Sequence, residues 1–329
     1  MQKTHRYTPF TDILAVLTLA FCAGLLPTSA QAAETRTLRL LFIGNSYTHR
    51  GGMPRVVKEL AEAGSPGLRV EFIAYGGSGA RLERHWQGGT QNLVSIAGMT
   101  ATERQAAVQS LRDALAKDPD DARARAVLRQ HGRLQQLGAQ PGKWDFVALQ
   151  SYGDDHGDAA RYAEYAEKFA KVIKAQGGRP LLYETTPGTM NAKPLIAPPE
   201  ADAVLAKAKV IAALADRLDA TVAPMSLVAL RCQTVRPDLT LRWVNDGHPN
   251  QTMGYLTACT FYAAMFERSP EGLPVDSVTD IKAFGEGKDA DGGPLVRTFS
   301  PQDRADLQRI AWEGFSQFQQ LRQDERQKK

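Results

Sequence analysis

Ser46 is a candidate nucleophile because of its place in the chain. An apolar segment over 38–43, interrupted only by Arg39, runs directly into Gly44-Asn45-Ser46. Its length and flanks suit a buried parallel strand that ends in a turn. The hydroxyl would then be exposed at the carboxyl edge of a sheet, near a helix start whose N–H groups can stabilise an oxyanion. The alternative is that Ser46 only caps the following helix.

His248 is the candidate general base for this serine. A serine hydroxyl is not nucleophilic at neutral pH and needs a base beside it. Pro249 restricts the backbone directly after His248, and Asp246, two positions before it, could orient the imidazole ring. An apolar helix is expected to follow over 253–266. The alternative is a solvated surface histidine in a turn.

The elements that would position these residues alternate between strands and helices. Such alternation predicts an α/β fold, in which a parallel sheet is covered by helices on both faces and the ligand site lies at the carboxyl ends of the strands. Strands are predicted over 38–43, 69–74, 146–149, 180–183 and 221–223, and helices over 54–63, 159–175, 200–218, 253–266 and 301–322.

Two further features set the domain organisation. The segment 101–137 is rich in Ala, Arg, Gln and Asp, with apolar residues at helical spacing, and predicts a helical hairpin inserted in the domain. Outside it no long linker divides the chain, so residues 33–329 are expected to form a single domain.

The first residues predict an exported protein. Lys3 and Arg6 precede an apolar run over 13–26, and Ala30-Gln31-Ala32 supplies the small residues that signal peptidase accepts. We therefore expect residues 1–32 to be a signal peptide, and the mature chain to be periplasmic or secreted without stable membrane insertion. An uncleaved anchor is the alternative, but the run falls short of the ~20 apolar residues that span a bilayer.

Composition excludes several partners and cofactors. The chain carries 40 basic and 36 acidic residues, and this small, scattered excess argues against nucleic-acid binding. Cys232 and Cys259 remain after cleavage and could form a disulfide or be buried free thiols. No zinc-like cluster is present, and the glycines over 76–79 lack the dinucleotide-loop spacing. Neither a zinc site nor a nicotinamide cofactor is therefore expected.

Two blocks resemble the SGNH/GDSL hydrolase superfamily. The segment 44–48, Gly-Asn-Ser-Tyr-Thr, is similar to its first block, and 246–250, Asp-Gly-His-Pro-Asn, to its last. Segments 144–150 and 255–262 add matches to an exported subgroup, and the likeness extends over about 38–273 except for the insertion. The resemblance implies a three-layer α/β/α sandwich with a flavodoxin-like parallel sheet, and ester hydrolysis without a cofactor.

Carried to this chain, the resemblance implies Ser46 as nucleophile and His248 as base. The N–H groups of Ser46 and Gly79 would form part of the oxyanion hole. The family's acid stands three residues before the histidine, where this chain has Asn245, and Asp246 lies one residue nearer. We expect Asp246 to orient His248, because a carboxylate stabilises the imidazolium and an amide does not. The alternative is a Ser-His dyad in which Asn245 holds the ring.

The third block also departs from the family pattern. Where Gly-x-Asn-Asp would supply an oxyanion-hole asparagine, this chain has Gln150, whose side-chain amide is the expected donor. The nearby Asp154, Asp155 and His156 could be metal ligands, but acidic residues in a loop are usually solvated. Further residues that could contact substrate in a sugar pocket are Trp86, Tyr152, Glu184 and Asn245.

These residues predict an exported serine esterase. Export, polar loops and the lack of a long apolar lid favour a small-molecule or carbohydrate ester as substrate, most simply an acetyl group on a sugar. The alternative is a catalytically inactive glycan-binding protein on the same scaffold, which the irregular acid position and the missing asparagine would explain.

Overall fold

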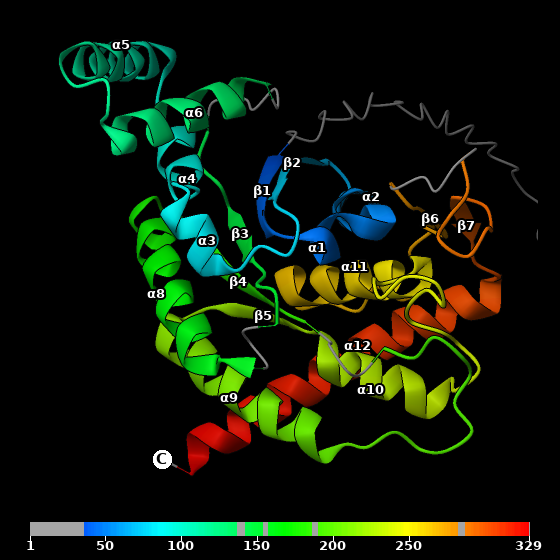
Figure 1. Ribbon diagram of the computed structural model, residues 1–329. Coiled ribbons are helices and arrows are strands. Elements are labelled where there is room, and N and C mark those ends of the chain that lie inside the picture. Colours follow the sequence, from blue (N-terminus) through cyan, green and yellow to red (C-terminus); the bar gives the residue numbers. More distant parts are fainter. Residues whose placement is uncertain (1–35, 137–141, 154–156, 186–189, 282–286, 329) are drawn as a thin grey trace, which may run out of the picture. The chain divides into compact units, whose positions relative to one another are not determined.

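Five parallel strands form the central sheet of the computed structural model (Figure 1). Contacts within the chain separate Met1–Glu34 from Thr35–Lys329. The structure describes residues 36–136, 142–153, 157–185, 190–281 and 287–328, so the predicted signal peptide lies outside the described residues. The strands of the sheet are β1 (Arg36–Gly44), β2 (Leu68–Gly76), β3 (Phe146–Leu149), β4 (Arg179–Glu184) and β5 (Thr221–Pro224).

Strand order in the sheet is β2-β1-β3-β4-β5. The chain moves outward from β1 to β2 and then continues on the other side of β1 from β3 onward. This is the flavodoxin-like order, which places a topological switch point between β1 and β3, and ligands of such folds bind beyond the carboxyl ends of the strands there. Ser46 follows β1 after a single residue, Asn45, and Gln150 directly follows β3, so both predicted site residues lie at the switch point.

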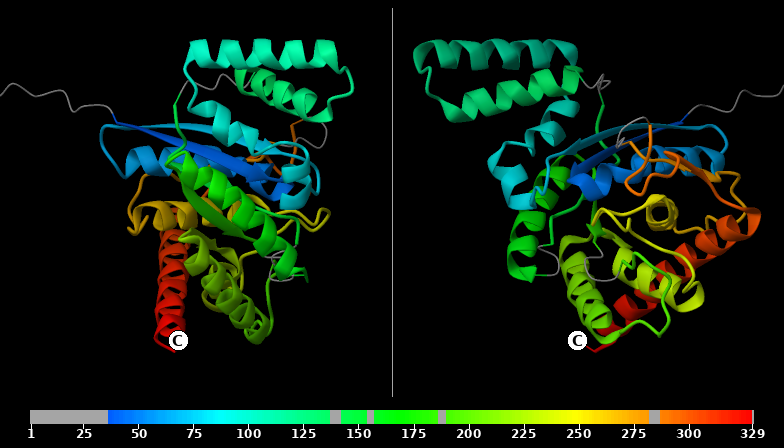
Figure 2. Two further views of the ribbon diagram at one scale, coloured as in Figure 1. Left: turned by 90° about the vertical axis from the view of Figure 1, so that its left-hand side faces the viewer. Right: turned by 45° about the vertical axis from the view of Figure 1, so that its right-hand side comes forward.

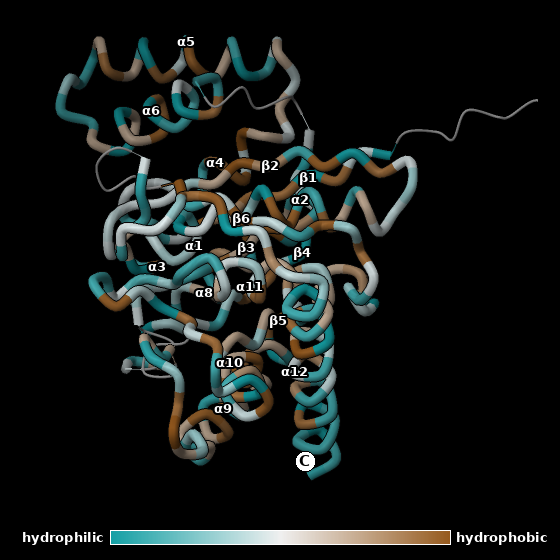
Figure 3. Tube along the Cα trace, turned by 90° about the vertical axis from the view of Figure 1, so that its right-hand side faces the viewer, coloured by the Kyte–Doolittle hydropathy of each residue, from teal (hydrophilic) through white to brown (hydrophobic). Residues whose placement is uncertain are grey.

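Alternate residues of β1 belong to two hydrophobic cores, because successive side chains of a strand point to opposite faces. Leu40 and Phe42 pack with residues of α2, α10, α11 and α12, whereas Leu41 and Ile43 pack with residues of α8 and α9. The sheet therefore lies between two helical layers, as Figures 1 and 2 show, and the predicted three-layer α/β/α fold is confirmed. From Arg322 to its end, α12 carries only hydrophilic residues (Figure 3).

The predicted helices agree in position with the structure, which also contains helices and a small sheet that the pattern did not predict. The additions are α1, η1, α3, α4 and α10, and the antiparallel pair β6 (Ser277–Thr279) and β7 (Val296–Thr298). The helices are α1 (Ser46–His49), η1 (Arg50–Gly52, a 3-10 turn), α2 (Met53–Ala63), α3 (Leu82–Gln87), α4 (Asn92–Ala97), α5 (Ala101–Lys117), α6 (Ala122–Gln136), α8 (Ala159–Ala175), α9 (Asp202–Leu218), α10 (Met225–Val235), α11 (Gln251–Phe266) and α12 (Pro301–Gln327).

The predicted helical hairpin is present as α5 and α6, which lie side by side (Figure 2). The helix α5 has no buried residue, whereas α6 buries Ala124 and Leu134. The amide of Gln130 on α6 donates to the carbonyl of Gly88, which ties the hairpin to the loop after α3. The hairpin is therefore an appendage that contributes little to the two cores.

Cys232 and Cys259 are both buried free thiols, which decides between the two possibilities that the sequence left open. Burial in apolar surroundings raises the pKa of Cys232 to about 12 and raises that of Cys259 as well. Within the residues described, no helix combines the length and apolar character that crossing a membrane requires.

Candidate active site

Ser46 begins α1 immediately after the buried strand β1. The turn is closed by Asn45, whose side-chain oxygen accepts from the N–H of Tyr47 and whose amide donates to the carbonyl of Ala80. Gly44 leaves the space this turn needs, since a Cβ there would lie 2.2 Å from the Thr48 hydroxyl oxygen. The strand end and the cap together fix the direction of the serine backbone.

His248 lies in a short loop before α11. The N–H of Trp243 donates to the carbonyl of His248 at 3.3 Å, and Arg242 pairs with Pro249 in an isolated bridge. Asn250 caps α11 by accepting from the N–H of Met253. Because both ends of the loop are closed in this way, His248 is held at the carboxyl edge of the sheet.

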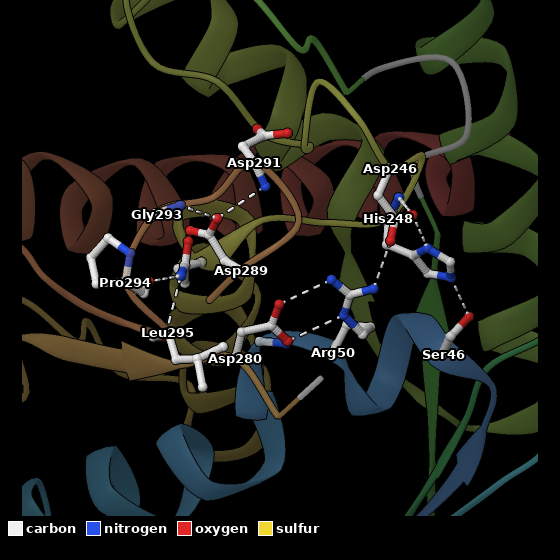
Figure 4. A network of polar contacts seen from close by, with 12 residues as sticks. Ser46, Arg50, Asp246, His248, Asp280, Asp289, Asp291, Gly293, Pro294 and Leu295 are labelled. Atoms are coloured by element: carbon white, nitrogen blue, oxygen red, sulfur yellow. Dashed lines mark hydrogen bonds and ion pairs between the residues drawn. The ribbon is translucent and has the colours of Figure 1, made fainter. Parts of the chain in front are cut away.

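The two predicted catalytic side chains meet although they are 202 positions apart in the sequence. His248 Nε2 lies 2.8 Å from Ser46 Oγ. The other ring nitrogen, Nδ1, contacts Asp246 Oδ1, and the same oxygen accepts from the main-chain N–H of His248 at 3.1 Å. Figure 4 shows the resulting order serine, histidine, aspartate. This is the arrangement in which an imidazole can remove the proton from a serine hydroxyl.

Asp246 is ionised under ordinary conditions. Burial raises the pKa of its carboxyl, but the hydrogen bonds from His248 and Arg50 oppose this and hold the pKa at about 2. Asn245, the residue at the family's usual acid position, is exposed, and its main-chain N–H donates to Asp291 Oδ1. The carboxylate of Asp246 is thus the side chain that contacts the imidazole.

Main-chain N–H groups are the candidate oxyanion donors. Within the described residues, the N–H groups of Ser46 and Gly79 have no hydrogen-bond partner. Gly79 lies in an exposed turn with φ of 56°, a conformation that favours glycine.

Gln150, in contrast, is buried within the turn. Its Oε1 accepts from the N–H of Asn45 at 2.7 Å and from the Thr48 hydroxyl at 3.1 Å, and its Nε2 donates to the carbonyl of Ser151 at 2.7 Å. The Gln150 side chain therefore joins the end of β3 to the turn that carries the serine. Its predicted role as an oxyanion donor stays a prediction.

The residues predicted to contact substrate lie in different surroundings. Tyr152 is 53% exposed and lies close to Tyr47. The pKa of Tyr47 is raised mainly by burial and next by the nearby Tyr152. Trp86 is half-buried and packs edge-on against Phe169 of α8. Glu184 is 1% exposed and accepts from the N–H of Ser226. Of these three, Tyr152 is the one beside the serine turn, whereas Trp86 and Glu184 take part in internal packing.

The sequence did not single out Arg50 or Asp280, which extend the polar network (Figure 4). Arg50 Nη1 donates to Asp246 Oδ2 at 2.9 Å, and its Nε and Nη2 donate to Asp280 at 3.2 and 2.9 Å. Asp280 is 230 positions away from Arg50 and directly follows the end of β6. No local pattern marks such a pair, because neither residue belongs to a motif.

In the described part of the chain, no group of three or more His, Cys, Asp or Glu side chains is placed to hold a metal ion. Asp154, Asp155 and His156, the alternative ligands, lie outside the described residues.

Comparisons with known proteins concern the fold. The sequence matches no family model and no curated protein sequence. A DUF4886 family protein from Bacteroides uniformis has a similar structure, with a TM-score of 0.51, 16% identity, and coverage of 85% of this chain and 95% of that one. For a proposed SGNH hydrolase from Slackia heliotrinireducens, the TM-score is 0.42 and the identity 22%, and the match covers 70% of this chain and 100% of that one. For an acetyl-xylooligosaccharide esterase from Geobacillus, the TM-score is 0.39 and the identity 14%, and the match covers 71% of this chain and 95% of that one. At 16% identity, the similarity to the Bacteroides uniformis structure describes the fold and not the reaction.

Proposed function

We propose that this protein is a serine ester hydrolase of the SGNH type, with Ser46 as nucleophile, His248 as general base and Asp246 as the acid. The observation that carries the proposal is the 2.8 Å contact between Ser46 Oγ and His248 Nε2, with Asp246 on the other ring nitrogen. His248 would take the serine proton as Oγ attacks the ester carbonyl, and Asp246 would stabilise the imidazolium. The free N–H groups of Ser46 and Gly79 would stabilise the oxyanion.

A fluorophosphonate probe tests this mechanism. We expect it to label Ser46 in the purified protein, and Ser46→Ala to lose both labelling and ester turnover while it keeps the wild-type melting temperature. A half-buried hydroxyl at a helix start contributes little to packing, so this variant separates chemistry from folding. If the probe does not label the wild-type protein but the protein binds sugars, the inactive glycan-binding alternative would be supported instead.

The proposed substrate is a short acyl ester, most simply acetate on a carbohydrate. Exposed Tyr152 and half-buried Tyr47 supply aromatic faces beside the serine, and aromatic residues commonly line ligand sites. Acetylated sugars, p-nitrophenyl esters of increasing chain length and acyl thioesters should be compared. We expect Tyr152→Ala to lower kcat/KM for an acetylated sugar more than for p-nitrophenyl acetate. A preference for long acyl chains would reject this substrate class.

Export is part of the proposal. The basic start, short apolar run and small residues before position 33 support cleavage of a signal peptide. Mass spectrometry of the exported protein should find a mature chain that begins near Ala33. An intact Met1 in a membrane fraction would contradict it.

A further inference from the structure

Arg50 is a buried cation directly behind the serine turn. Its side chain is 3% exposed, and it follows α1 in the turn η1. A buried charge is tolerated only where opposite charges and hydrogen bonds compensate it. Two carboxylates do so here, Asp246 through Nη1 and Asp280 through Nε and Nη2. The planar guanidinium fork is suited to hold both at fixed angles.

Asp280 holds Arg50 from a separate part of the chain. Its side chain is fully buried, and its main-chain N–H donates to the carbonyl of Leu295 at 2.9 Å. Its Oδ1 also accepts from the N–H of Gly51, next to Arg50, at 3.4 Å. The guanidinium is thus fixed by the β6 segment, independently of the loop that carries His248.

The unusual position of Asp246 explains why such support is needed. Asp246 is two residues before His248, and its Oδ1 alone serves both the main-chain N–H and Nδ1 of that histidine. The carboxylate is therefore held on one side only within its own loop. Arg50 supplies the second side by donating to Oδ2, which prevents rotation of the carboxylate away from the ring.

We infer that Arg50 is a positioning residue that orients the Asp246 carboxylate toward His248, and that Asp280 both holds Arg50 and offsets its charge. The inference rests on the proposed serine hydrolase function. Arg50 alone would neutralise Asp246 and weaken its stabilisation of the imidazolium. With Asp280 included, the three described side chains carry a net negative charge, which favours the protonated ring.

Other polar groups surround the histidine and stay unchanged in the test below. Tyr47 of α1 lies edge-on to the imidazole at 5.9 Å between centroids, and Arg242 and Tyr152 lie near Tyr47. Asp291 accepts from the N–H groups of Val244 and Asn245 in the histidine loop. Changes confined to Arg50 or Asp280 therefore report on this ion pair.

Opposite charge effects provide a test that does not require turnover. The titration midpoint of the His248 ring can be followed by NMR of the histidine Cε1–H groups, with His248→Asn to assign its signal. Arg50→Met removes a positive charge, so protonation becomes easier and the midpoint should move to higher pH. Asp280→Asn removes a negative charge, and the midpoint should move to lower pH. Each shift is expected to be on the order of one pH unit.

Turnover then tests positioning. The double variant with Arg50→Met and Asp280→Asn leaves neither partner of the pair as an uncompensated buried charge, so it should fold even where a single variant does not. We expect its kcat to fall by about 10- to 100-fold with little change of KM, because a misplaced catalytic group costs rate far more than binding. A purely structural pair would leave kcat of the folded double variant unchanged.

Arg322→Met is the matched control. Arg322 of α12 is also a largely buried arginine, which pairs with Asp216 of α9 and donates to the carbonyl of Ala220. Its loss should lower the melting temperature without moving the His248 midpoint or kcat.

A lower midpoint in Arg50→Met would show that the Asp246 carboxylate has left the ring, which supports the positioning role. Midpoints that stay unchanged in both variants would overturn the inference, as would wild-type kcat in the double variant. If the wild type cleaves no ester and Ser46 is not labelled, the proposed function fails. The two midpoints still decide whether the ion pair acts on His248.

Discussion

Replacing Asp246 by asparagine should separate a charged triad from a dyad. The carboxylate accepts on both sides, from His248 through Oδ1 and from Arg50 through Oδ2. An amide has one oxygen, so its NH₂ group must face a donor, either the imidazole or the guanidinium. The ring is then held in the wrong tautomer or the buried arginine loses an acceptor, and both outcomes disfavour proton removal from Ser46.

The expected loss is large. Removal of the triad acid lowers turnover on the order of 10⁴-fold in well-studied serine hydrolases, which corresponds to about 5 kcal/mol of transition-state stabilisation. The expected loss in the free energy of unfolding is smaller. The pKa of Asp246 falls from 3.8 to about 2 on folding, and a shift of this size is worth about 2 kcal/mol. Because this pKa is depressed, the stabilisation is complete above pH 3.8 and disappears as the pH falls toward 2.

The assay is kcat/KM for p-nitrophenyl acetate, with thermal unfolding of each variant at pH 7 and pH 3. Asn245→Ala is the matched control, since the exposed Asn245 side chain adjoins Asp246 but the contacts to the imidazole come from the carboxylate. We expect this control to retain most of its turnover. Equal and mild losses in the two variants would refute the reasoning and assign neither residue as the acid.

Two further predictions concern the fold around the site. Gly44→Ala should lower stability by about 1–3 kcal/mol and impair turnover, because the new methyl group would lie 2.2 Å from the Thr48 hydroxyl oxygen. Urea unfolding measures the stability of this variant. Gly132→Ala is the control, because Gly132 lies in a helix with open space around the added methyl group, and equal unfolding midpoints of the two variants would contradict the prediction. Cys232 and Cys259 should react with a thiol reagent only after unfolding, and a reducing agent should leave the melting temperature unchanged, since both thiols are free and buried. A reagent that titrates them in the folded protein would show that they are accessible.

The sequence by itself determined the type and place of the main elements. The five strands could be located from their apolar residues and flanking turns, as the agreement of 146–149 with β3 illustrates, although β1 and β2 extend beyond the predicted 38–43 and 69–74. The placement of Ser46 at a strand end and of His248 before an apolar helix was visible for the same reason, because both depend on residues adjacent in the chain. The helix α10 was not predicted, because its apolar residues do not recur at the spacing that marks one face of a helix.

Only the tertiary structure decided which side chains meet. Trp86 and Glu184 looked like pocket residues, but each has an internal partner, Phe169 or Ser226, that no local pattern reveals. The ion pair of Arg50 with Asp280 spans 230 positions, and pairing at that distance depends on how β6 returns to the serine turn. Local periodicity reports the face of an element that is buried, whereas the contacts of a buried charge depend on the packing of the whole chain.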